Sequence, residues 1–276
     1  MDRYILINVS NILAFLFLLA DNVYSYMEPK NERNPYLQAH LTYISPAVFT
    51  FYMWIPIQIL LGGFVIYQFY PQAEEHVTTI NWNFVGIVAL NCLWLNLWQR
   101  DMISLSWIAI LIMVFQLSYI YYILEFTYQP YEHTDEPLDV ILDIAFVHLP
   151  FSLYHSWSIV LLAITTFTIF MPEKKAENPS LIELILVIFV LISFELIAIM
   201  YIEANNDFAG FAGYLVIAFT FIGISYEQEE IVIHLTAILL SIISAAYFIV
   251  SLVKKCLMPK KQSVETQNET TDLTLT

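Results

Sequence analysis

The sequence predicts an all-α protein, a polytopic bundle of about eight transmembrane helices. The first observation is composition: of 276 residues, 59% are hydrophobic and only 13% are charged, and the mean hydropathy is +0.68. A soluble domain carries roughly 25% charged residues. The second observation is that long apolar stretches recur along the whole chain. A helix needs about 20 such residues to cross the ~30 Å hydrocarbon layer, where it must bond its own backbone.

Eight stretches meet this description. They lie at residues 4–25, 46–70, 83–99, 103–126, 146–171, 180–202, 208–226 and 231–253. The third is short and the seventh ends in polar residues, so seven spans remain an alternative. Arg3 precedes an apolar run as in a signal peptide, but Leu18 stands where a cleavage site would need a small residue. We therefore expect the first stretch to be retained as a helix.

The pattern separates a membrane region, residues 1–253, from a tail. The tail, residues 254–276, begins basic and becomes polar and disordered. The two halves of the chain share no motif of the kind that marks the repeats of transporters.

The net charge of −15 comes from acidic residues in the predicted loops, at Glu74–Glu75, Glu132–Asp139 and Glu227–Glu230. These are expected to be solvated connections. With so few basic residues in compact clusters, the chain has no nucleic-acid footprint. The expected partner is membrane lipid, and no oligomeric state is predicted.

The positive-inside rule does not decide the orientation by count, because an eight-span arrangement places five Lys and Arg residues on each side of the membrane. The densest juxtamembrane cluster is in the tail, at Lys254, Lys255, Lys260 and Lys261. It favours an integral membrane protein with both termini in the cytosol. Glycosylation of the Asn268-Glu269-Thr270 sequon would place the tail in the lumen instead.

The two cysteines cannot build a disulfide framework. Cys92 falls inside the third span, where we expect it to pack as an apolar residue. Cys256 lies beside the tail lysines, where it is either a palmitoylation site or an unmodified thiol.

Three stretches are more particular than generic membrane sequence: Ser45–Trp54, Leu90–Trp94 and Leu149–Trp157. In this order they resemble the TspO/MBR family of tryptophan-rich sensory proteins, and more closely its longer relatives with a Pro-Phe-Ser-x-Tyr-x-x-Trp signature. The resemblance covers residues 1–171, the five-helix membrane unit of that family, and thereby implies that residues 172–253 are a three-helix membrane extension. Ser156 stands where the family usually has glycine before the signature tryptophan.

The resemblance implies a helix bundle whose upper cavity, under the first connection, accepts a flat lipophilic molecule such as a porphyrin or sterol. By motif match, the residues that line it are Phe49, Trp54, Asn91, Trp94, Phe151, Tyr154 and Trp157.

The residues themselves support a less specific interpretation. Asn91 and Trp94 share one helical face, and an asparagine in hydrocarbon needs a polar cavity or a partner on a neighbouring helix. Trp98 continues this face, and with Trp82 at the other end it is predicted to belong to the aromatic belt. Pro150 predicts a kink or a helix start in the fifth span, which alternatively opens space for a ligand.

Four ionisable residues are predicted at bilayer depth and are functional candidates: His148, His155, Glu195 and His234. Glu195 either serves proton or substrate transfer or locks two helices together as a hydrogen-bonded carboxyl. His148 and His155 are seven residues apart and project from one face, but no other ligand spacing supports haem or metal there. His234 is expected to make local hydrogen bonds.

The sequence contains no nucleophile elbow, His-Glu-x-x-His motif, phosphate-binding glycine loop or zinc-type cysteine pair. It therefore predicts neither an enzyme nor a cofactor. Three functions remain: binding or sensing of a lipophilic ligand, transport or conduction through Glu195, and a scaffold without a ligand. Small residues at Ala209 and Gly213, and at Ser241 and Ala245, predict close packing of the last two helices.

Overall fold

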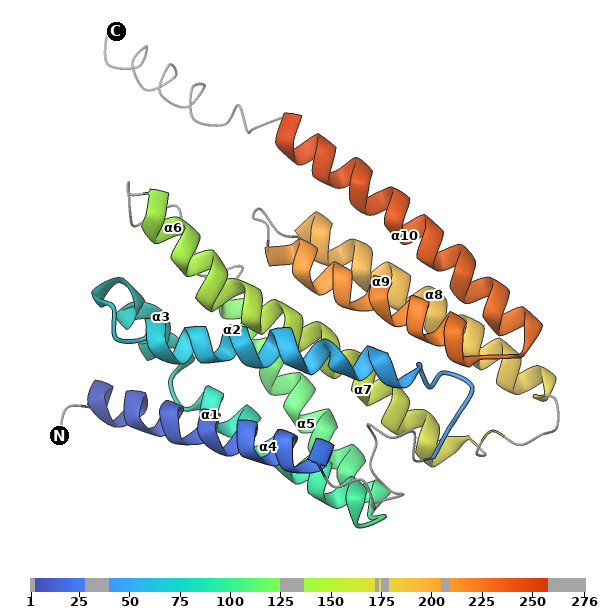
Figure 1. Cartoon of the computed structure of the whole chain (residues 1–276), viewed down its shortest axis with the longest axis horizontal. Helices are drawn as coiled ribbons and strands as arrows, with labels where there is room; N and C mark the ends of the chain where they lie inside the picture. The colour runs from blue at the N-terminus through green and yellow to red at the C-terminus, as the bar shows by residue number, and fades with distance from the viewer. Residues whose placement is uncertain are drawn as a thin grey trace, which may run out of the picture.

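The computed structural model describes residues 3–27, 40–124, 137–171, 174, 179–204 and 209–257. All regular structure within these ranges is helical, and the helices form one bundle (Figure 1). The first part contains α1 (Arg3–Met27), the 3-10 turn η2 (Val48–Met53), α2 (Trp54–Tyr67), η3 (Pro71–Ala73), α3 (Glu74–Ile80), α4 (Asn83–Gln99) and α5 (Ile103–Tyr122). The second contains α6 (Pro137–Asp143), the π-helical turn η5 (Ile144–His148), α7 (Leu149–Phe170), α8 (Leu181–Ala204), α9 (Ala209–Glu227) and α10 (Ile231–Leu257).

The membrane spans agree with the predicted stretches. In the described ranges, seven helical segments are long and apolar enough to cross a bilayer: Arg3–Ser25, Val48–Tyr67, Ile103–Tyr122, Leu138–Phe170, Leu181–Ala204, Ala209–Glu227 and Ile231–Leu257. The short third stretch is α4. A bend of 58° separates α4 from the preceding segment Pro71–Ile80, which contains η3 and α3. The two segments make an eighth span if they are counted as one. The prediction of a polytopic helical membrane protein is confirmed.

Two of the predicted acidic loops contain helix. Glu74 and Glu75 are exposed to solvent as predicted, but they form the first turn of α3, and Asp139 lies in the first turn of α6. Carboxylates are favoured at this end of a helix by its dipole, and Pro71 is preorganised to start the helical segment. Residues 132–136 of the predicted loop Glu132–Asp139 lie outside the described residues, as do most of the tail and its sequon.

Pro150 lies in the first turn of α7, directly after the π-helical turn η5. The fifth span thus begins earlier than expected, at α6, and runs through η5 into α7. A π-helical turn is a local widening of the helix, and proline lacks the N–H that would continue the ladder. The predicted kink is therefore a change of helix type within one continuous span.

Helix α7 lies at the centre of the bundle, where it packs against α5, α2 and α9 (Figure 1). The three-helix extension is attached through α9. Two serines of α7 donate hydrogen bonds to carbonyls of α9: Ser152 Oγ to Ala209 O at 2.8 Å and Ser156 Oγ to Gly213 O at 2.7 Å. The serine that replaces the usual glycine of the motif therefore holds the extension.

The small residues pack differently from the prediction. Ala209 and Gly213 lie against α7 and α8, since a Cβ at Gly213 would approach Tyr201 Cδ1 to 2.5 Å. Ala245 of α10 is exposed, and the neighbouring Ser244 is the buried residue. The predicted close packing of the last two helices is present, since α9 and α10 are in contact and the Tyr214 hydroxyl donates to the Ser244 carbonyl at 2.8 Å. Ala245 takes no part in it, because spacing alone does not tell which face of α10 meets its neighbours.

Candidate functional site

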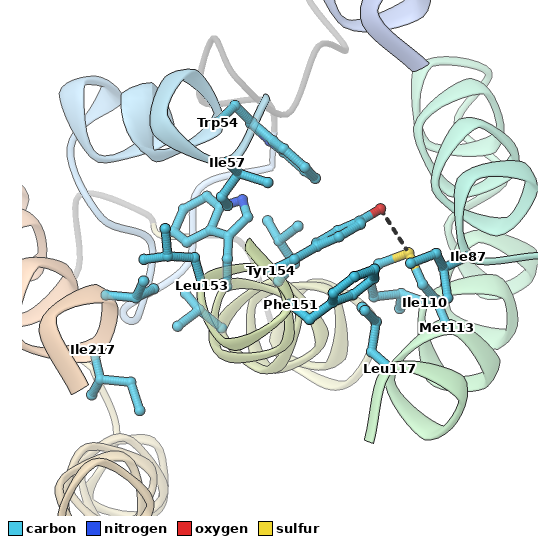
Figure 2. Packing of buried hydrophobic residues seen from close by; sticks show 14 of the residues in the cluster. Trp54, Ile57, Ile87, Ile110, Met113, Leu117, Phe151, Leu153, Tyr154 and Ile217 are labelled. Atoms are coloured by element: carbon cyan, nitrogen blue, oxygen red, sulfur yellow. Dashed lines mark hydrogen bonds between the residues drawn. The ribbon is translucent and has the colours of Figure 1, made fainter. Parts of the chain in front are cut away.

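Four aromatic side chains from the motif stretches meet in the core. We call Phe51, Trp54, Tyr154 and Trp157 the aromatic cluster. Their rings pack edge to face, with centroids 5.6 Å apart for Phe51 and Trp157, 5.5 Å for Trp54 and Tyr154, and 6.5 Å for Trp54 and Trp157. Figure 2 shows Trp54, at the start of α2, above Tyr154 on α7. The cluster thus joins the second and fifth helices of the predicted five-helix unit.

Local sequence explains this arrangement. Tyr154 and Trp157 are three residues apart on α7 and so share a face, which points towards the first turn of α2. The segment that carries Phe51 is tied to the extension, because Ala47 N donates to Gly223 O at 3.0 Å. Gln228 adds bonds from its side-chain amide to the carbonyls of Thr42 at 3.2 Å and Ser45 at 2.8 Å.

The Asn91 amide of α4 lies beside the Tyr154 hydroxyl. Asn91 is completely buried, and neither atom of its side-chain amide has a hydrogen-bond partner among the described residues. The Tyr154 hydroxyl points across to Met113 Sδ of α5 at 3.7 Å (Figure 2). The predicted partner of Asn91 on a neighbouring helix is thus the Tyr154 hydroxyl of α7, although the contact does not have the geometry of a full hydrogen bond.

Two polar groups of the cluster itself are also without a partner. The indole nitrogens of Trp54 and Trp157 are buried and have no hydrogen-bond partner in the described part of the chain. The hydroxyl of Thr50, next to Phe51 in the sequence, has none there either. Buried polar groups in proteins are nearly always hydrogen-bonded. The cluster therefore presents an unusual concentration of unused donors.

The rings of the cluster are in direct contact with one another, and each of the three largest is at most 1% exposed. The space that the resemblance assigns to a ligand is thus occupied by Trp54, Tyr154 and Trp157. A ligand could enter only if these rings moved apart.

The other predicted site residues lie around this centre. Phe151 packs against Phe64 and Phe84, with centroids 5.2 Å and 6.2 Å away. Trp94 donates its indole N–H to Thr165 Oγ1 at 3.3 Å, which ties α4 to α7. Both are core residues next to the cluster.

Phe49 lies apart from the other six residues. Its ring contacts Phe219 at 5.7 Å and Tyr226 at 5.6 Å, both on α9. The structure thus places six of the seven residues in the core between α2, α4 and α7, and turns Phe49 towards the extension.

A comparison with known families identifies the family of the chain. The model of a family described as TSPO-like protein matches residues 8–250. The chain belongs to this TSPO-like family. The match continues through α8 and α9 and most of α10, beyond residue 171, where the motif resemblance ends. No curated protein and no solved structure matches the sequence significantly.

The prediction that Trp98 of this TSPO-like protein belongs to the aromatic belt is wrong. It is 1% exposed and packs against Trp94, with centroids 6.0 Å apart, whereas Trp82 is 42% exposed. Trp98 therefore belongs to the core and not to an aromatic belt. The helical face that carries Asn91 and Trp94 continues inward to the end of α4.

The two histidines of the fifth span contact different helices. His155 bridges α5 and α8, with Nε2 2.9 Å from Ser118 Oγ and Nδ1 2.7 Å from the Tyr201 hydroxyl. His148 lies near His76 of α3, with ring centroids 6.1 Å apart. The two histidines are seven residues apart, which is a distance of ~10 Å along the helix axis, so they contact different neighbours. No metal-binding group of three His, Cys, Asp or Glu exists among the described residues.

Glu195 joins two helices of the extension. Its Oε2 accepts a hydrogen bond from Ser244 Oγ at 2.5 Å, and the Tyr214 hydroxyl donates to the Ser244 carbonyl at 2.8 Å. The other carboxyl oxygen of Glu195 has no partner within the described ranges. The contact matches the predicted helix lock between α8 and α10.

The remaining predicted residues have local surroundings. His234 Nδ1 lies 2.7 Å from the Ser225 carbonyl, as expected for a local hydrogen bond. Cys92 is buried, and Cys256 is exposed in the last turn of α10. Palmitoylation of Cys256 stays a prediction.

Sequence reasoning missed one buried ionisable pair, His76 and Asp143. His76 Nε2 lies 3.0 Å from Asp143 Oδ2. The sequence gives little signal for His76, because Glu74 and Glu75 directly before it are typical of a solvated loop. The one signal that could have predicted α3 is Pro71, because proline is favoured in the first turn of a helical segment.

Proposed function

We propose that this TSPO-like membrane protein binds or senses a small, flat, lipophilic molecule of the porphyrin or sterol type at the aromatic cluster. The observation that carries the proposal is the set of buried donors without partners in the described residues: the indole N–H groups of Trp54 and Trp157 and the amide of Asn91. A ligand with acceptor atoms at its edge would satisfy them.

Hydrogen bonds are the source of specificity for such a ligand. A lipophilic molecule enters from the bilayer, so its transfer into the protein gains little from leaving water. A polar bond formed in a membrane interior contributes about 1–2 kcal/mol in model peptides. Three unused donors at one place therefore favour a ligand that carries several oxygen acceptors.

The rings of the cluster must separate to admit the ligand. An aromatic pair contributes about 0.5–1.5 kcal/mol beyond its area. Stacking of Trp54 and Trp157 on a planar ligand would replace the contacts they make with Tyr154 and Phe51. Aromatic side chains can thus fill the site when it is empty and line it when it is occupied.

Titration of the protein in nanodiscs with protoporphyrin IX, and separately with cholesterol, tests the proposal. Saturable binding of at least one probe is expected. Trp157→Phe keeps a ring and removes one donor, so the affinity should fall about 5- to 30-fold, which corresponds to about 1–2 kcal/mol. Asn91→Ala should weaken binding as well.

The matched control is Trp107→Phe. The Trp107 indole N–H donates to Thr166 Oγ1 at 2.9 Å, away from the aromatic cluster, so its loss should leave the affinity unchanged. Equal affinities of the wild type, Trp157→Phe and Asn91→Ala would refute the assignment of the site.

A second candidate function is transport coupled to Glu195, and the unpartnered carboxyl oxygen in the described structure favours it. It requires pH-dependent flux in proteoliposomes that is lost in Glu195→Gln. The control is Glu183→Gln on the same helix, at an exposed side chain that caps α8 through Ser180. Flux that is indifferent to Glu195→Gln would exclude this function.

A further inference from the structure

Gln58 of α2 carries a buried amide that the motifs do not assign to the ligand site. The residue is 8% exposed, and neither the oxygen nor the nitrogen of its side-chain amide has a hydrogen-bond partner within the described part of the chain. An amide buried without hydrogen bonds is strongly unfavourable, and a membrane interior offers no water to compensate it. Such a residue is expected to bind a group from outside the protein chain.

Other buried amides of the bundle, in contrast, are bonded to the protein. Gln68, directly after α2, accepts a hydrogen bond from Asn11 Nδ2 at 3.1 Å and donates to the Asn8 carbonyl at 3.2 Å. Among the residues that the structure describes, Gln58 and Asn91 are the two whose side-chain amides have both atoms buried and neither atom bonded. The fold therefore leaves these two amides available to a ligand.

Gln58 lies one helical turn from the aromatic cluster. Trp54 and Gln58 are four residues apart in α2, so they share a face of the helix. Long side chains in a helix lean towards its N-terminus, which directs the Gln58 amide towards Trp54. Trp54 in turn packs on Tyr154 (Figure 2) and on Trp157, both of α7. The Asn91 amide of α4 lies beside the Tyr154 hydroxyl, so two unused amides from different helices border the same rings.

The chemistry of an amide defines what it can recognise. The nitrogen of a glutamine side chain offers two donors, and its oxygen accepts hydrogen bonds. The indole N–H groups of Trp54 and Trp157 only donate, so a ligand with acceptor oxygens is sufficient for them. The unbonded Oε1 of Gln58 requires a donor on the ligand as well. A hydroxyl group meets both requirements, whereas an ether or ketone oxygen can only accept.

We propose that Gln58 is a specificity-determining residue at the aromatic cluster, and that its amide selects lipophilic ligands that carry a hydroxyl group. The inference rests on the proposed binding function and narrows its ligand class. The hydroxyl donates to Gln58 Oε1 and accepts from an amide nitrogen or an indole N–H. A site built to bond a hydroxyl rejects an analogue without it, because the buried groups of the site are then left unpaired.

A matched pair of ligands tests this selection. Cholesterol and its 3-O-methyl ether have the same rings, but the ether has no donor. In nanodiscs free of sterol, the wild type should bind cholesterol about 5- to 30-fold more tightly, as expected for one hydrogen bond in a membrane. Gln58→Met keeps the length of the side chain and removes the amide, so the two ligands should bind to it with similar affinities.

The matched control is Gln116→Met on α5. Gln116 Nε2 donates to Asn83 Oδ1 at 3.1 Å, so this amide is already bonded within the protein. The preference for cholesterol over the ether should therefore remain in Gln116→Met.

The outcomes separate this inference from the function on which it rests. If the wild type binds neither cholesterol nor protoporphyrin IX, the proposed function fails, and the role of Gln58 fails with it. Three results would refute the hydroxyl selection while the binding function stands: equal wild-type affinities for cholesterol and the ether, a preference that survives Gln58→Met, or binding of protoporphyrin IX alone.

Stability without ligand gives a second readout. A glutamine that only joins helices would stabilise the free protein, whereas an unbonded amide does not. Gln58→Met should therefore be at least as stable as the wild type in ligand-free equilibrium unfolding. Gln116→Met, which removes a bond to Asn83, should be less stable. A clear loss of stability in Gln58→Met would show that the amide is bonded within the protein and would overturn the proposal.

Discussion

Replacing Gly213 by alanine should destabilise the attachment of the extension. The added Cβ would lie 2.5 Å from Tyr201 Cδ1 and 2.6 Å from Cε1, well inside van der Waals contact. The Tyr201 ring cannot easily give way, since its hydroxyl lies 2.7 Å from His155 Nδ1 and its ring packs against Tyr121 at 5.4 Å. The helix α9 must therefore shift away from α8.

The magnitude follows from two opposing effects. Overpacking a well-packed interior costs about 1–3 kcal/mol. Alanine returns up to about 1 kcal/mol through its higher helix propensity. A net loss of about 1–2 kcal/mol is expected for Gly213→Ala.

Equilibrium unfolding in mixed detergent micelles, monitored by tryptophan fluorescence, measures this loss. The control is Gly62→Ala, whose Cβ would meet only the tip of the Phe15 ring at 3.0 Å, on a partly exposed side chain. Tyr201→Leu should relieve the clash, so the double variant Gly213→Ala/Tyr201→Leu should lose less stability than the sum of the single variants. A Gly213→Ala protein as stable as Gly62→Ala would refute the steric argument.

Two further predictions concern the same attachment. Ser152→Ala and Ser156→Ala each remove one bond to α9 and should each cost about 0.6 kcal/mol in the same unfolding assay, roughly additively; a stabilised double variant would contradict the role of these bonds. Gln228→Leu removes two bonds to the segment before η2 and should cost about 1–2 kcal/mol. Limited proteolysis of that segment should become faster, and an unchanged rate would argue against its anchoring by Gln228.

The spans were predictable because their signal is local. The stretch predicted at 180–202 is α8 at Leu181–Ala204, and the one predicted at 231–253 is α10 at Ile231–Leu257. Short polar helices were not predictable in this way. Helices α3 and α6 have seven residues each and are rich in acidic groups, so they resemble loops in a hydropathy pattern.

The sequence predicted which residues belong to the candidate site better than it predicted how they are arranged. Motif order identified Trp54, Tyr154 and Trp157, which do meet. It could not show that Phe49 turns to α9, which depends on the helices of the extension. Nor could it show that Trp98 is buried, because the Trp98 ring packs against Trp94 and against His40, which is far away in the sequence. Phe51 was missed for the same reason, since its ring enters the cluster from a 3-10 turn.

The sequence by itself determined that this protein is a helical membrane bundle of TSPO-like type, because lipid requires each long apolar segment to bond its own backbone. Only the tertiary structure decided which polar groups meet. Ser156 reaches Gly213, His76 reaches Asp143, and the donors of Trp54 and Trp157 reach no partner in the described chain. These contacts join residues on different helices, and in a bilayer close packing between helices, rather than any local periodicity, selects them.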